Sequence, residues 1–153
     1  MVRALDDGVP TGGGEQRLKV PPHSIEAEQS LLGGLMLDHQ SWDKIADVVS
    51  AQDFYRKDHR LIFAAIAGLA DEANPCDVVT VSEFLDNRGE LEQAGGLEYL
   101  ASLANETPGA ANARSYAKIL RERSMLRLLI SAGNEVSGAA FGTDGRSASE
   151  IVD

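Results

Sequence analysis

The sequence predicts an all-α protein: a small helical bundle head followed by a long helix and the truncated start of a helical hairpin. Apolar residues recur at helical spacing from residue 25 onward, and no segment alternates apolar and polar residues over any length. Serine, threonine, glycine and proline stand between the apolar segments, where helices begin and end. With 153 residues, of which 43% are hydrophobic, the chain is long enough to bury one core.

Three parts follow from this pattern. We expect a flexible tail over residues 1–20, a helical head over 21–108, and the long helix with the start of the hairpin over 109–153. The tail is polar and aperiodic, contains a Gly-Gly-Gly run, and ends at a pair of prolines.

The head is expected to begin with a helix capped by Ser24, with two glutamates in the favourable first turn. Gly33 and Gly34 lie inside this helix and predict the close approach of a neighbouring helix. Ser41 is expected to cap a short helix, and a further helix is expected from near Asp58 to Asp71. Apolar residues of that last helix that we expect in the core are Leu61, Ile62, Ala65 and Ile66.

Two more helices complete the predicted head. Thr80 and Glu83 form a capping box, since their side chains can each satisfy a free backbone donor at a helix start. Gly89 suits the left-handed position just beyond the end of that helix. The pair Gly95-Gly96 precedes a short helix that carries Leu97, Leu100, Leu103 and Ala104.

The long helix is predicted from residue 112 to about residue 141. Thirty helical residues span about 45 Å, which is more than a small head can cover, so we expect this helix to project and to contact a partner. Gly133 and Gly138 are positions where it could bend. A turn at 142–145 and a second capping box at 147–150 predict that another helix begins there. We therefore expect this chain to be a piece cut from a longer protein. The apolar stripe of the long helix is formed by Tyr116, Ile119, Leu120, Leu126, Leu129, Ile130 and Val136.

The charge distribution is uneven. The net charge is −10, yet residues 112–127 carry five cations and one glutamate, a local charge of +4 that leaves −14 for the rest. An acidic body argues against a domain whose main task is to bind nucleic acid. Arg114, Lys118 and Arg121 share one helix face, which favours an acidic protein partner or a contact between subunits over a merely solvated face.

Several chemistries find no support in the sequence. None of the four lysines follows a glycine, so the chain has no phosphate-binding loop of the Walker A type, and we expect no cofactor. His23, His39 and His59 are far apart, and the single cysteine, Cys76, has no Cys-x-x-Cys partner, so we expect no metal site. No segment is apolar enough for a membrane span or a signal peptide, which favours a cytoplasmic protein.

The stretch DFYRKDHRLIFAAI, residues 53–66, allows three interpretations: a nucleic-acid patch, a catalytic histidine loop or a joint between packed helices. His59 beside Asp58 is the best acid–base candidate, but we favour a structural role and expect a hydrogen-bonded residue at a helix start near the surface. We favour the joint, with Phe54 and Tyr55 packed between helices, and we expect no catalytic residue in the chain. A small hydrolase that uses His59 is the enzymatic alternative.

Four segments carry a family resemblance. They are IEAEQSLLGGLMLD (25–38), DFYRKDHRLIFAAI (53–66), DVVTVSEFLDNRGELEQAGGLEYLASL (77–103) and ANARSYAKILRERSMLRLLI (111–130). In order and spacing they resemble the N-terminal domain of the bacterial replicative DNA helicases of the DnaB family. The resemblance covers residues 20–153.

This resemblance implies a non-catalytic fragment of an ATP-dependent 5'-3' DNA helicase, whose ATPase domain, with its ATP and Mg, is absent here. The family's N-terminal domains pair as dimers within a hexameric ring and dock the primase C-terminal domain. A helicase loader is a further candidate partner, and DNA is bound mainly by the missing domain. The alternative is a free-standing helical adaptor without a motor. The residues we expect at the partner or subunit interface are Arg121, Arg123, Leu126, Leu129 and Ile130, with Arg114 and Lys118 nearby.

Overall fold

The computed structural model describes residues 19–142, which contain six α-helices, two short 3₁₀ helices and no strand. The predicted all-α class is confirmed. Tail residues 1–18 and the second capping box at 147–150 lie outside the described residues. In chain order the elements are α2 (Ile25–Leu37), η1 (His39–Ser41), α3 (Trp42–Ile45), η2 (Ala51–Asp53), α4 (Lys57–Asp71), α5 (Val78–Asn87), α6 (Gly96–Glu106) and α7 (Ala113–Gly142).

Helix α2 is the central element of the head and packs against α4, α6 and α7. Its start is as predicted, because the Ser24 Oγ accepts a hydrogen bond of 3.2 Å from the Ala27 N–H. The predicted close approach is also confirmed: a Cβ on Gly33 would collide with the backbone carbonyl of Leu103 in α6. Only glycine therefore lets these two helices touch at this point.

The core collects fully buried side chains from every long helix of the head. Leu31 of α2, Ile62 of α4, Leu100 of α6 and Leu120 of α7 are each at most 1% exposed. Burial of one such side chain stabilises the fold by about 1.5–3 kcal/mol. Of the predicted core residues in α4, only Leu61 is partly exposed. The predicted short helix that carries Leu97 is α6, and Leu97 lies on its exposed side, at 51% exposure.

Two predicted helix caps are wrong. Ser41 makes no capping hydrogen bond, and its buried Oγ has no partner among the described atoms. At α5 the cap is Asp77, which accepts from the Thr80 N–H at 2.9 Å, so Thr80 is the third residue of the helix and not its cap. The same hydrogen bond lowers the pKa of Asp77, because it stabilises the carboxylate. Gly89 has the predicted positive φ, 70°.

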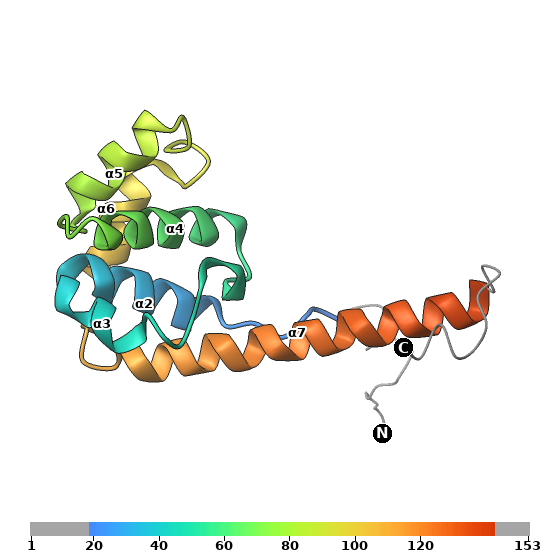
Figure 1. The fold of residues 1–153 in the computed structure, drawn as a ribbon. Helices are drawn as coiled ribbons and strands as arrows, with labels where there is room; N and C mark the ends of the chain where they lie inside the picture. The colour runs from blue at the N-terminus through green and yellow to red at the C-terminus, as the bar shows by residue number, and fades with distance from the viewer. Residues whose placement is uncertain (1–18, 143–153) are drawn as a thin grey trace, which may run out of the picture.

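Helix α7 runs for 30 residues without interruption, and neither Gly133 nor Gly138 breaks it. Its buried residues are Ala113, Ala117, Leu120 and Ser124, a stripe of mostly small side chains that lets α2 pack closely. No residue from 125 to 142 is buried. Figure 1 shows the consequence: the short helices lie against the first half of α7, and the second half extends beyond them.

Candidate interaction surface on the long helix

The second half of α7, residues 125–142, is here called the apolar arm. Three of the predicted interface residues, Leu126, Leu129 and Ile130, lie on it and are 40%, 67% and 48% exposed. Met125, Leu128, Val136 and Phe141 are exposed on the same arm, between 50% and 86%. Isolated exposed apolar residues are ordinary, but a contiguous apolar surface marks an interaction site. The arm is therefore the strongest candidate interface among the described residues.

The predicted basic residues sit on the first half of α7 and differ in their contacts. Arg114 donates to the Lys44 carbonyl at 2.8 Å and lies 3.6 Å from Asp47, while about half of its side chain stays exposed. Lys118 is exposed and forms no ion pair within residues 19–142. Arg123 lies 3.9 Å from its neighbour Glu122 and makes no ion pair with the head in that part of the chain.

Arg121 has a structural role that its position in the sequence did not indicate. Its Nη1 lies 3.0 Å from Oδ1 of Asp53, a carboxylate whose side chain is only 4% exposed. Arg127 approaches from the next turns of α7: its Nη2 donates to the Asp53 carbonyl at 2.8 Å and its Nη1 donates to the Pro22 carbonyl at 2.7 Å. We call Asp53, Arg121 and Arg127 the Asp53 clamp. It fixes the end of the packed half of α7 to the head.

Tyr55 supports the clamp. The Arg127 guanidinium lies 5.5 Å from the centre of the Tyr55 ring, and His23 stacks on that ring at 4.2 Å. The segment before α2 is thereby held beside α7. The predicted joint at Phe54-Tyr55 is confirmed, since Phe54 is fully buried in the core.

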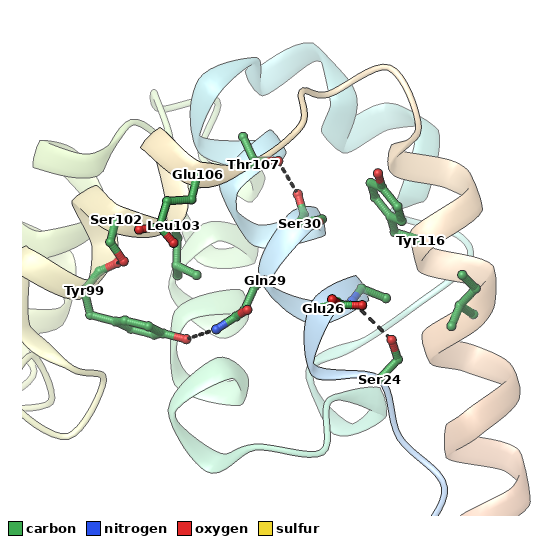
Figure 2. A pocket seen from close by; sticks show the side chains of 12 residues that line it. Ser24, Glu26, Gln29, Ser30, Tyr99, Ser102, Leu103, Glu106, Thr107 and Tyr116 are labelled. Carbon is green, nitrogen blue, oxygen red and sulfur yellow. Dashed lines mark hydrogen bonds between the residues drawn. The ribbon is translucent and has the colours of Figure 1, made fainter.

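His59 is not near the surface, so that expectation is wrong. The ring is fully buried, with Nδ1 at 2.6 Å from Oε1 of Glu28 and Nε2 at 2.6 Å from the Tyr99 hydroxyl. Glu28 also accepts the Tyr55 N–H at 2.6 Å. Figure 2 shows Tyr99 reaching from α6 toward Gln29 of α2, whose amide lies 3.2 Å from the same hydroxyl.

This buried network joins α2, α4 and α6 and satisfies each of its polar groups. Glu28 stands in the first turn of α2, where its sequence position predicts only a favourable interaction with the helix dipole. A glutamate and a histidine 31 positions apart carry no local signal that they meet. These hydrogen bonds hold α2, α4 and α6 together at the joint. Because the His59 ring is fully buried, it has no access to a substrate.

The remaining candidates for chemistry were Cys76 and a metal site, and the described part of the chain supports neither. Cys76 is buried, and desolvation raises the pKa of its thiol. Within residues 19–142 no group of three or more His, Cys, Asp or Glu side chains is arranged to hold a metal ion. None of the described helices combines the length and apolarity needed to cross a membrane.

Comparison with known sequences identifies the family. Residues 20–122 match the sequence model described as "DnaB-like helicase N terminal domain". The chain belongs to this family. It is 44% identical over 137 residues to replicative DNA helicase DnaB of Haemophilus influenzae, and 39% identical over 149 residues to that of Leifsonia xyli. These alignments cover 90% and 97% of this chain but 29% and 32% of the two helicases, so it spans about a third of their length.

Solved structures of the DnaB N-terminal domain have the same fold. The domain from Mycobacterium tuberculosis superposes with a TM-score of 0.83 at 39% identity, covering 88% of this chain and 94% of that one. The domain from Helicobacter pylori superposes with a TM-score of 0.66 at 21% identity, covering 76% and 90%. The helical head and the long helix are thus features that this chain shares with the N-terminal domain of the family.

Proposed function

We propose that this chain is the oligomerisation and primase-docking domain of an ATP-dependent replicative DNA helicase that acts in the cytoplasm. The apolar arm carries the proposal, because it exposes seven large apolar side chains on a helix that the head does not cover. A partner helix, from a second copy or from the rest of the chain, would cover this surface. The motor, with its ATP and Mg, would lie in the remaining two thirds of the full-length protein.

Two observations support primase as a partner. The family relationship comes first, because the curated relatives are replicative helicases. Second, the Helicobacter pylori domain of this fold has been described together with its interactions with primase. In this chain the partly exposed Arg123 and the apolar arm are the surface on which we expect such a contact. A helicase loader is a second candidate for the same surface.

Assembly is tested by static light scattering over a range of chain concentrations. A Leu129→Asp substitution places a charge on the arm, so we expect association to weaken at least about tenfold. Val79→Asp is the matched control, because Val79 of α5 is 66% exposed and lies outside the arm. Equal association of both variants and the unmodified chain would contradict the assembly role of the arm.

Primase docking is tested by calorimetric titration with the primase C-terminal domain of the same organism. Arg123→Glu is the sharper variant, since Arg121→Glu would also break the Asp53 clamp. Arg88→Glu on α5 is its control, because Arg88 is 61% exposed and lies far along the chain from α7. We expect saturable binding that Arg123→Glu weakens and Arg88→Glu does not. Binding that is absent from a folded, assembled chain would refute the docking role.

A further inference from the structure

A groove of about 500 Å³ opens on the head between α2, α6 and the packed half of α7 (Figure 2). Tyr99 lines it from α6 and Tyr116 lines it from α7, where Ile119 adds an aliphatic surface. Glu26 at the start of α2 and Glu106 at the end of α6 also line it. The groove does not reach the apolar arm, because its lining on α7 ends at Ile119.

The groove is acidic and has no cation of its own. Glu26 and Glu106 are exposed, and neither forms an ion pair in the described part of the chain. No lysine, arginine or histidine lines the groove, and the neighbouring Arg56 is paired with Asp58. The surrounding head, residues 19–108, contains six Lys or Arg and sixteen Asp or Glu, a net charge of −10. The groove therefore attracts a cation and repels an anion.

Most polar groups of the groove either accept hydrogen bonds only or have already used a donor. The hydroxyls of Ser102 and Thr107 each donate to a backbone carbonyl of the head at 3.0 Å. The Tyr99 hydroxyl lies 2.6 Å from His59 Nε2 and accepts from the Gln29 amide at 3.2 Å. The two ionised glutamates can only accept. A ligand rich in donors is the best chemical match, and the arginine guanidinium has five N–H donors and no acceptor.

The lining also indicates what accompanies the guanidinium. Figure 2 shows Tyr99 on the α6 side of the groove and Tyr116 on the α7 side, and a guanidinium stacks on such rings better than an ammonium does. The volume lies in the range of pockets that hold ligands larger than one side chain, which leaves Ile119 for an apolar neighbour of the arginine. The first 18 residues of the chain match poorly, since their two Arg and three Asp or Glu give a net charge of −1.

We propose that the groove binds a short segment of a partner protein in which an arginine stands beside an apolar residue. The guanidinium would lie between Glu26 and Glu106 and stack on Tyr116, and the apolar neighbour would pack on Ile119. This inference goes beyond the proposed function, which places assembly and primase docking on the apolar arm and Arg123. Arg123 lies one turn beyond Ile119 and does not line the groove. The head could thus recruit a further partner while the arm is engaged.

Peptide titration followed by NMR tests the site. The probe is acetyl-Leu-Arg-Leu-amide, and acetyl-Leu-Gln-Leu-amide is its neutral control. We expect saturable shifts of the ring signals of the two groove tyrosines with the arginine peptide only. Glu26→Gln/Glu106→Gln should weaken binding at least about tenfold. Glu83→Gln/Glu92→Gln is the matched control, because it removes the same charge from exposed positions outside the groove and should leave binding unchanged. Circular dichroism checks that both variants fold.

A Tyr116→Leu variant separates stacking from charge. Both glutamates remain, so the affinity for the arginine peptide should fall to that for acetyl-Leu-Lys-Leu-amide, which should bind the unmodified chain more weakly. Equal binding by the groove variant and its control, or equal affinity for arginine amide and for the peptide, would overturn the proposal. Loss of assembly in Glu26→Gln/Glu106→Gln, or displacement of the peptide by the primase C-terminal domain, would overturn it as well, because the groove would then belong to a subunit or primase contact.

Discussion

The two halves of α7 belong to one continuous helix yet face different surroundings. Residues 113–124 place a narrow stripe of alanine, leucine and serine against the head. Residues 125–142 include no fully buried residue, and Arg127 near their start is the residue that the Asp53 clamp ties to the head. The larger apolar side chains are on the half that the head does not cover. Apolar content alone therefore does not locate the core of this protein. The packed half uses small residues because α2 lies close, and the arm keeps bulky residues for a surface supplied from elsewhere.

The largest effect that separates the halves is expected from leucine truncation. Leu120→Ala removes a side chain that is 1% exposed, and the cavity should lower the free energy of unfolding by about 2–5 kcal/mol. Leu129→Ala removes one that is 67% exposed, and it should cost less than about 0.5 kcal/mol in the monomer. Urea unfolding at low protein concentration measures both. Similar losses would mean that the arm is packed like the core.

A smaller effect is expected at the boundary between the halves. Asp53→Ala leaves the Ser50 N–H and the Arg121 guanidinium without their buried acceptor, so the free energy of unfolding should fall by about 1–3 kcal/mol. Hydrogen exchange should then rise in the α7 turns that contain Arg121 and Arg127. Asp47→Ala is the control, because Asp47 is 74% exposed and its contact with Arg114 is a surface pair, expected to be worth less than about 1 kcal/mol. If both substitutions cost the same, the clamp does not anchor the helix.

The sequence predicts those parts of the fold that depend on local rules. Ser24, Gly33 and Gly89 are placed correctly, because a helix cap, a close helix contact and a left-handed turn each need particular residue types. The local rules fail where two similar candidates compete. Asp77 and Thr80 can both cap a helix, and the structure selects the aspartate, whose carboxylate accepts from both the N–H and the hydroxyl of Thr80.

The long-range polar contacts could not be predicted in this way. Arg121 and Asp53 are 68 positions apart, and His59 and Tyr99 are 40 apart, so no window of sequence contains either pair. Only one local signal was available: Ser50 and Asp53 form a capping box at η2, which marks Asp53 as an ordered residue. The exposed arm was predictable from helix length, since a helix of about 45 Å exceeds the head that the preceding residues can build.

The smallest expected effect has the opposite sign and concerns the glycines of the arm. A Cβ on Gly133 would meet nothing within 4 Å, and the same holds for Gly138. Alanine at either position should therefore stabilise the helix by about 0.5–1 kcal/mol, since glycine is the poorer helix former and no contact is disturbed. Far-ultraviolet circular dichroism of the monomer should show more helix and a steeper thermal transition. Reduced association of these variants, despite the added helix, would indicate that a partner helix needs the glycines for close approach, as α6 needs Gly33.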